Sequence, residues 1–309
     1  MATVTVASWN LLDYKMPRYR DTDGEKRNRR IAEVIRGLGA DVVLVQELVS
    51  PGSGTALLHG LAKDTGMDCY AELPWISEDD AFAGTVAAAD ARTGYHTGAL
   101  WKPGFASVPG TFATFGAEIG LWHSTATITL TSEETGPFVV MPFHLDPFDP
   151  SRRMTEAQQL VRIAARHEKL PVIGGGDNNC EAANEITDPD PYRGRPWFPK
   201  MIHQVIVTTY SPEGVPLEWE ADRRPARILA AGGLVDVAAH RHTGPGPLPP
   251  TAGHHPDDPF PHRRIDRILA NPAAATRVID CRTHPSDEAK ELSDHIPVSV
   301  TIDLSPSRS

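Results

Sequence analysis

Two short apolar runs constrain the fold most, because strands with apolar side chains on both faces must be covered on both faces. DVVLVQEL (41–48) and LPVIGGGD (170–177) are nearly continuous in hydrophobicity over the length of a strand. Strands of this kind are typical of α/β architectures, in which both faces of the strand are buried. Both runs end in polar side chains, Gln46-Glu47 in the first and Asp177-Asn178-Asn179 in the second.

The remaining periodicity predicts both helices and further strands. TVTVASWN (3–10) alternates as a strand does, which places Asn10 at its C-terminal end. Apolar residues at i, i+3, i+4 and i+7 predict a helix over 31–38 that stops at Gly39, and Ser151 is expected to cap a second helix. Further strands are expected at 96–101, 124–130, 137–146, 263–270 and 295–304.

From residue 181 to about 261 the composition shifts towards proline, glycine, tryptophan and charge. Within this segment only 202–210 and 226–238 have the pattern of regular structure, and 243–261 is expected to be a loop. No repeat of fixed short period and no clear linker interrupts the chain. We therefore predict one α/β domain over residues 1–309, with a long insertion at about 181–261.

Composition excludes several classes of protein. A hydrophobic content of 40% with 23% charged residues fits a globular protein with a sizeable core. The N-terminus lacks the pattern of a signal peptide, and no apolar run is long enough to cross a bilayer. Three scattered cysteines fit neither a disulfide framework nor a zinc site, and they favour a reducing cytoplasm. A formal net charge of −10 disfavours a general duplex-DNA binder, and nothing points to a protein partner.

Polar side chains of a restricted kind stand where the expected strands end. They are carboxylates, carboxamides and imidazoles, and none is a thiol: Asn10, Glu47, His144, Asp177, Asn179, Asp266, Asp294 and His295. Ligands collect at one end of the strands in open α/β architectures. Oxygen ligands suit Mg²⁺ or Mn²⁺, and a carboxylate with an imidazole suits proton transfer. Each residue alone also has an ordinary explanation, such as a surface turn, a structural histidine or a surface ion pair.

The order of these motifs carries a resemblance to a known family. SWN (8–10), VQE (45–47), FHL (143–145), GDNN (176–179), IDRIL (265–269) and SDH (293–295) together resemble the endonuclease/exonuclease/phosphatase (DNase I-like) superfamily. That superfamily includes DNase I-like nucleases, abasic-site endonucleases, inositol polyphosphate 5-phosphatases and sphingomyelinases. The resemblance spans almost the whole chain. It implies a four-layer α/β/β/α sandwich of two mixed β-sheets flanked by helices, and divalent-metal-dependent phosphoester hydrolysis.

The resemblance also implies a metal site. Glu47 is expected to be the principal ligand, helped by Asn10 and Asp294. The cation is expected to be Mg²⁺, with Mn²⁺ as the alternative. Bound there, it would hold a phosphoryl oxygen and neutralise the charge that grows in the transition state.

The catalytic roles follow in the same way. Asp177 is expected to orient or deprotonate the attacking water, and Asn179 to donate a hydrogen bond to the pentacoordinate phosphoryl group. His295 is expected to contact the phosphate while Asp266 fixes its tautomer and favours its charged form. His144 is a second imidazole, a candidate acid or phosphate-binding group. These five residues form the predicted catalytic set.

Some residues depart from the family pattern. Asn178 stands where an aromatic residue is frequent, and Phe143 stands where threonine is frequent. Leu12 replaces an acid typical of abasic-site enzymes, which weakens that branch specifically.

The glycines at 174–176 are expected to let the backbone turn so that Asp177 and Asn179 reach one phosphate.

The substrate is less constrained. Basic pairs follow or precede several motifs, at residues 18–20, 26–30, 152–153, 193–195 and 263–264, and could steer an anion into a cleft. The aromatic residues of the insertion could stack a base or form a small core of their own, and its histidines are expected at the surface. The candidate substrate-binding residues are Tyr95, His96, Arg152, Arg193, Trp197 and Arg264.

Three functions remain open at this stage. The acidic charge and an insertion that could roof the cleft favour hydrolysis of a nucleotide or other small phosphorylated compound. The alternative is an endonuclease or exonuclease that cleaves DNA or RNA. A non-catalytic phosphate-binding module is disfavoured, because the set of metal-binding and water-orienting residues is intact.

Overall fold

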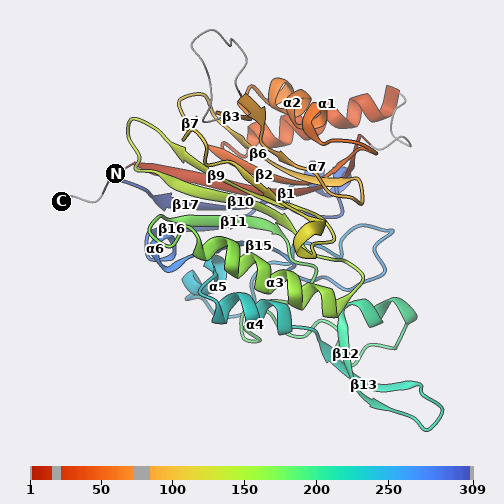
Figure 1. The fold of residues 1–309 in the computed structure, drawn as a ribbon. Coiled ribbons are helices and arrows are strands. Elements are labelled where there is room, and N and C mark those ends of the chain that lie inside the picture. The colour runs from red at the N-terminus through yellow and green to blue at the C-terminus, as the bar shows by residue number, and fades with distance from the viewer. Residues whose placement is uncertain (1, 16–21, 73–83, 307–309) are drawn as a thin grey trace.

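Two β-sheets packed face to face form the centre of the computed structural model, which describes residues 2–15, 22–72 and 84–306 (Figure 1). The first sheet has the order β16 (Val278–Thr283), β17 (Val298–Asp303), β1 (Thr3–Tyr14), β2 (Val42–Val49), β6 (Tyr95–Trp101), β5 (Ala88–Ala89). The second has the order β14 (Val235–Asp236), β15 (Asp266–Ala270), β11 (Val172–Asp177), β10 (Phe138–His144), β9 (Thr125–Thr131), β7 (Ala106–Ser107), and β8 (Ala113–Phe115) also pairs with β9.

Both sheets are mixed. The pairs β1–β2 and β10–β11 are parallel, and the other neighbours in the two sheets are antiparallel. Helices α1 (Thr22–Gly37) and α2 (Thr55–Thr65) cover the first sheet, while α3 (Pro150–Ala165) and α4 (Arg224–Ala231) cover the second (Figure 1). The predicted four-layer α/β/β/α sandwich is therefore confirmed.

The remaining elements are short. Two small ladders pair β3 (Tyr70–Glu72) with β4 (Gly84–Val86), and β12 (Val205–Tyr210) with β13 (Pro216–Ala221). The short helices are α5 (Val237–Arg241), α6 (Pro272–Ala275), α7 (Asp287–Leu292) and the 3₁₀ turns η2 (Ala117–Ile119) and η3 (Pro199–His203). Of the helices in the described part of the chain, none is long and apolar enough to cross a membrane.

Alternation along the strands divides the core into layers. In β1, Val4 and Val6 pack between the two sheets, whereas Ala7 and Trp9 pack under α1 and α2. Strand β10 repeats this division, because Val140 faces the first sheet and its neighbours face α3 and α4. A residue at a strand end therefore emerges from a closely packed, rigid support.

The glycine run at 174–176 lies inside extended strand β11, so the expectation of a glycine turn is wrong. The glycines instead allow close approach between neighbouring strands and between sheets. A Cβ atom on Gly175 would lie 2.9 Å from the Cβ of Ser8 in the facing sheet, and one on Gly176 would overlap the carbonyl oxygen of Phe143. Absence of a side chain, rather than an unusual backbone angle, is what these positions require.

Two other expectations at element ends need correction. The N-cap of α3 is Asp149, whose carboxylate accepts hydrogen bonds from the backbone N–H groups of Ser151 and Arg152 at 2.8 and 3.2 Å. Pro150 takes the first helical position, so Ser151 already lies inside the helix. Strand β1 does not stop at Asn10 but resumes after an irregularity and ends at Tyr14.

The basic residues Arg18 and Arg20 lie outside the described residues.

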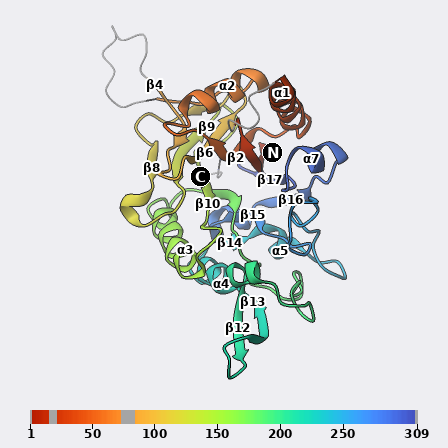
Figure 2. The same ribbon diagram turned by 90° about the vertical axis from the view of Figure 1, so that its right-hand side faces the viewer.

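The segment predicted as an insertion contributes to the second layer as well as to a projection. Its β12–β13 hairpin extends away from the sheets (Figure 2), while α4 contacts α3 and β14 adds an edge to the second sheet. A small core of its own forms around Tyr192, Met201 and Val205. The division of the chain into one domain with an insertion at about 181–261 stays a prediction.

Candidate active site

A cavity of about 1170 Å³ lies where β1, β2, β10, β11 and the segment before β17 end. Six of the eight predicted metal-binding and catalytic residues line it: Glu47, His144, Asp177, Asn179, Asp294 and His295. The other two, Asn10 and Asp266, lie directly behind this lining and are bonded to it. The six motifs therefore meet in one place, although they are spread over nearly the whole sequence.

Asp177, the last residue of β11, lies at the centre of the cluster. Its Oδ2 atom is 3.3 Å from the Asn10 amide nitrogen, 3.4 Å from His144 Nε2 and 3.6 Å from His295 Nε2. Its Oδ1 atom accepts a hydrogen bond from the backbone N–H of Asn179 at 2.8 Å. Burial opposes the charged form, but His295 and His144 lower the pKa of Asp177 below its usual range, so it is a carboxylate.

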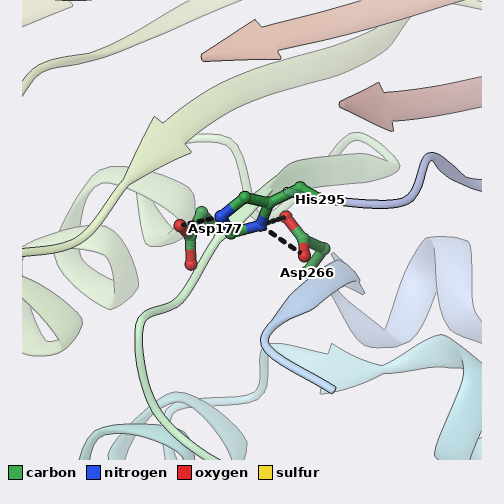
Figure 3. Close-up of side chains that lie close together, drawn as sticks. All are labelled: Asp177, Asp266 and His295. Atoms are coloured by element: carbon green, nitrogen blue, oxygen red, sulfur yellow. Dashed lines mark hydrogen bonds and ion pairs between the residues drawn. The ribbon is translucent and has the colours of Figure 1, made fainter. Parts of the chain in front are cut away.

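His295 is held between two carboxylates, as Figure 3 shows. Its Nδ1 atom donates to Asp266, with the two carboxylate oxygens at 2.8 and 3.0 Å, and its Nε2 atom faces Asp177. Burial disfavours a charged imidazole, but Asp266, Asp294 and Asp177 together raise the pKa of His295 well above its ordinary value. The imidazolium and Asp266 therefore form a fixed cation–carboxylate pair beneath the cavity.

Hydrogen bonds tie the SDH segment to the SWN segment. The hydroxyl of Ser293 donates to the carbonyl of Asn10 at 2.7 Å and accepts from the backbone N–H of His295 at 3.0 Å. The indole N–H of Trp9 donates to the carbonyl of His295 at 2.9 Å. Serine and tryptophan in these motifs thus position the neighbouring amide and imidazole.

One end of the cavity carries the features of a cation site. Glu47 accepts from the Asn10 amide at 3.0 Å and from the backbone N–H of Asp13 at 2.8 Å. Burial raises the pKa of Glu47, and the negative charges of Asp294 and Asp13 raise it further. The positive charge of His144 lowers this pKa but does not cancel the rise. The buried Oδ1 atom of Asp294 has no hydrogen-bond partner, although His295 Nε2 is 3.7 Å away. Converging carboxylates with an unsatisfied oxygen fit a hard divalent cation.

Asp177, Asp266 and His295 form a second group whose ligand atoms lie within 4.8 Å of one another and could hold a metal ion. The contacts within the group favour a different use. His295 Nδ1 is already committed to Asp266, which leaves only Nε2 and Asp177 directed towards the cavity. A carboxylate, an imidazole and a second carboxylate in series are suited to holding a proton in place.

Backbone strain is concentrated in this cavity. Leu12, Asp13, Glu47 and Asn179 all have positive φ angles, of 47°, 53°, 62° and 47°, and all four line the cavity. In the described residues Lys15 is the one other non-glycine residue with positive φ. Residues other than glycine rarely adopt this conformation, and such strain gathers at functional sites because it aims side chains there.

His123 is a site residue that sequence reasoning missed. Its ring stacks on that of His144 with centroids 4.0 Å apart and an interplanar angle of 17°. Burial and the charge of His144 lower the pKa of His123 well below its ordinary value, so this imidazole is neutral. The residue just before a predicted strand carries no pattern that would single it out.

The walls of the cavity include further residues, of which the sequence indicated only Arg263, as part of a basic pair, and Phe260, as an aromatic residue of the insertion. They are mainly aromatic or charged: Arg92, Trp122, Phe148, His255, Asp257, Asp258, Phe260 and Arg263. His255 was expected at the surface as one of several loop histidines, but it lines the cavity. Of the predicted substrate-binding residues, Tyr95 and Arg152 also line the cavity.

The structure does not bring the other four predicted substrate-binding residues to the cavity. His96 is fully buried, and its ring nitrogens bond Ala91 N–H and Ser50 C=O, at 2.9 and 3.1 Å. Trp197 packs on Trp219 in the core of the insertion, with ring centroids 5.2 Å apart, and Arg193 is exposed elsewhere. Arg264 is buried in ion pairs with Asp188 and Asp236, whereas its neighbour Arg263 lines the cavity.

Comparison with known families settles the family. The model described as the Endonuclease/Exonuclease/phosphatase family matches residues 7–295. The chain belongs to this family. The enzymes of the family hydrolyse phosphoester bonds and generally depend on divalent metals, so the prediction of a phosphoester hydrolase is confirmed. A search of curated proteins gives no match.

Solved structures agree with the fold. A mannosyl-6-phosphatase, Bt3783, from Bacteroides thetaiotaomicron VPI-5482 is 19% identical, with a TM-score of 0.59, over 97% of this chain and 100% of that chain. The 3′ phosphatase NExo from Neisseria, bound to a product DNA hairpin, is 17% identical, with a TM-score of 0.57, over 97% and 99% of the two chains. TDP2 from D. rerio, complexed with single-strand DNA product, is 16% identical, with a TM-score of 0.58, over 98% and 100%. At these identities the likeness shows a shared fold.

Proposed function

We propose that the protein is a Mg²⁺-dependent hydrolase of a small phosphorylated compound, in which water attacks phosphorus. The observation that carries the proposal is the cavity, whose walls surround the catalytic cluster on several sides and leave it partly open to solvent. The segment from His255 to Arg263, within and just after the predicted insertion, forms one of these walls. This concave site is slightly larger than the roughly 300–1,000 Å³ of a typical ligand pocket, so it has room for a whole small ligand.

Glu47, Asn10 and Asp294 are the residues that would hold the metal ion. The orphaned oxygen of Asp294 and the raised pKa of Glu47 support this choice, because a cation would satisfy both carboxylates. When bound, a divalent cation polarises a phosphoryl oxygen and stabilises the charge that develops on it. Mg²⁺ is preferred in the proposal because all three ligands offer oxygen, and Mn²⁺ is the alternative.

The chain's own residues supply orientation and proton handling. Asp177, kept ionised by its two imidazole neighbours, accepts a hydrogen bond from the attacking water and orients it. The side-chain amide of Asn179 is held in place because one of its N–H groups donates a hydrogen bond to the carbonyl of Leu145 at 3.0 Å. Its second N–H donates a hydrogen bond to a phosphoryl oxygen. His295 and His144 present positive charge to the phosphate.

The charges of the cavity favour a small substrate over a nucleic-acid chain. Six carboxylates line it, Asp13, Glu47, Asp177, Asp257, Asp258 and Asp294, against three arginines, Arg92, Arg152 and Arg263, and the two imidazolium groups of His144 and His295. Arg152 and Arg263 are each already paired with an aspartate, at 3.3 and 2.8 Å. A nucleic-acid backbone needs several uncompensated basic contacts, and Arg193 and Arg264 do not supply them here.

The three cysteines are all free, which supports the proposed location in a reducing cytoplasm.

The test compares two kinds of substrate under one set of conditions. Purified protein in Mg²⁺ is given a panel of nucleotides and sugar phosphates, and separately supercoiled plasmid, with EDTA and Asp177→Asn as controls. We expect phosphate release from the panel, lost in both controls, and intact plasmid. Plasmid nicking that both controls abolish, without release from the panel, would replace this proposal with a nuclease.

A further inference from the structure

One wall of the cavity is built from two aromatic rings and an arginine, Trp122, Phe148 and Arg152. The guanidinium of Arg152 lies 4.8 Å from the centroid of the Trp122 ring. The rings of Trp122 and Phe148 meet edge to face, with centroids 6.5 Å apart at 89°. Phe148 is 60% exposed, so the wall presents a large apolar face to the cavity and to water.

Two buried carboxylates fix this wall. Glu156 of α3 is fully buried, and its two oxygens accept the backbone N–H groups of Trp122 and Asp146, both at 2.6 Å. Asp146 in turn accepts from the backbone N–H of Phe148 at 2.7 Å and pairs with Arg152 at 3.3 Å. Loops from either side of β9 and β10 are thereby joined at one point. Such bonding holds exposed rings in place before a ligand arrives, which lowers the entropic cost of binding.

The chemistry of the wall points to a flat ligand. The charge of Arg152 is balanced by Asp146, so the guanidinium is a planar stacking surface rather than a free anion site. Exposed aromatic rings beside a planar cation are the arrangement that stacks heteroaromatic rings, and covering Phe148 would remove apolar surface from water. The wall and the catalytic residues line the same cavity, and the two are linked by His123, which follows Trp122 in the chain and stacks on His144 with ring centroids 4.0 Å apart.

We propose that Trp122, Phe148 and Arg152 form a stacking subsite for a planar ring of the substrate, next to the scissile phosphate. This rests on the proposed function and names its substrate class, a phosphomonoester or small phosphodiester that carries a heteroaromatic ring, as nucleotides do. Sugar phosphates without a ring of this kind share the phosphate site but not the stacking contact.

A matched pair of ligands isolates the ring. Adenosine 5′-monophosphate and ribose 5-phosphate have the same phosphoester on the same sugar and differ by the base. Binding of each is measured by calorimetry in Mg²⁺ with the Asp177→Asn protein, in the Asp177→Asn background alone and with Phe148→Ala or Trp122→Ala added. Tyr210→Ala is the matched control, because Tyr210 is an aromatic residue 53% exposed on the β12–β13 hairpin and not among the cavity-lining residues.

We expect the base to tighten binding about tenfold or more, as stacking of a base on aromatic side chains does. Phe148→Ala and Trp122→Ala should remove most of this advantage while binding of ribose 5-phosphate stays as before, and Tyr210→Ala should change neither. Equal binding of the two ligands, or an advantage that survives both substitutions, would overturn the subsite. Turnover of the panel by the unsubstituted protein reports separately on the proposed function. If only ring-free esters are hydrolysed, the hydrolase stands and the subsite falls.

Discussion

The buried glutamate behind the aromatic wall makes the stability of this protein depend on pH in a calculable way. Burial raises the pKa of Glu156 to about 7 from a usual value near 4.5, although hydrogen bonds from Trp122 and Asp146 partly oppose this rise. Between these two values the unfolded chain loses the proton while the folded protein keeps it. Glu156 therefore favours folding at low pH, and this contribution is lost as the pH rises from 4.5 to about 7.

The magnitude follows from the size of the shift. A shift of one pKa unit corresponds to about 1.4 kcal/mol, so Glu156 should lower the free energy of unfolding by roughly 3 kcal/mol across the whole window. Glu156→Gln keeps the shape of the protonated side chain and cannot ionise. All other ionisable groups are present in both proteins, so the difference between them reports mainly on this one carboxyl group.

Urea unfolding at pH 5 and pH 8 measures the effect, with exposed Glu133→Gln as the matched control. The difference in free energy of unfolding should move by about 2 to 3 kcal/mol in favour of Glu156→Gln between the two pH values. Glu133→Gln makes the same substitution at an exposed position and gives the baseline for this comparison. A constant difference for Glu156→Gln would refute the reasoning, because it would mean that Glu156 is already ionised in the folded protein at pH 5.

Two further predictions concern the packing of Gly175 and the ion pairs of Arg264. Gly175→Ala should lower the free energy of unfolding by about 1 to 3 kcal/mol, because its Cβ would lie 2.9 Å from that of Ser8, while exposed Gly52→Ala should be nearly neutral in the same urea titration. Arg264→Met should cost about 3 to 5 kcal/mol of stability by leaving Asp188 buried without its partner. The folded Arg264→Met protein should keep the KM of the unsubstituted enzyme, and a KM raised tenfold would restore Arg264 as a substrate-binding residue.

The place where the site forms could be predicted from the sequence because most of the predicted site residues stand at or near the end of an apolar strand. Strands of a layered fold have fixed ends, so Glu47 near the end of β2, His144 at the end of β10 and Asp177 at the end of β11 emerge at the same edge. Trp9 facing the helices and Asn10 reaching the cluster follow from alternation along β1. Roles that depend on a bound substrate or metal remain predictions.

Residues outside regular strands could not be found in this way. Arg263 and Arg264 are adjacent, but Arg263 lines the cavity whereas Arg264 lies in buried ion pairs. No periodic pattern in the sequence distinguishes these two positions. Trp122 and His123 lie in an irregular segment before β9, where no periodicity fixes direction. Glu156 resembles an ordinary polar residue of an amphipathic helix until the facing loops are in place.

The glycine run shows a different limit. Three consecutive glycines usually indicate a turn, because local sequence reports backbone freedom and not what packs opposite. In this fold Gly175 meets Ser8 from the other sheet, a contact between residues far apart in the chain. Tertiary packing therefore determines that residues 174–176 form a strand, whereas the local composition predicts a turn.

The Mg²⁺ dependence of turnover tests the central claim most directly, because the account gives Glu47 and Asp177 different roles in one cluster. Phosphate release is measured against Mg²⁺ concentration for the unsubstituted protein, Glu47→Gln and Asp177→Asn. We predict that Glu47→Gln raises the half-saturating Mg²⁺ concentration at least tenfold, whereas Asp177→Asn lowers kcat about 100-fold or more with little change in that concentration. Turnover that persists in EDTA, or an unchanged Mg²⁺ requirement in Glu47→Gln, would contradict the account.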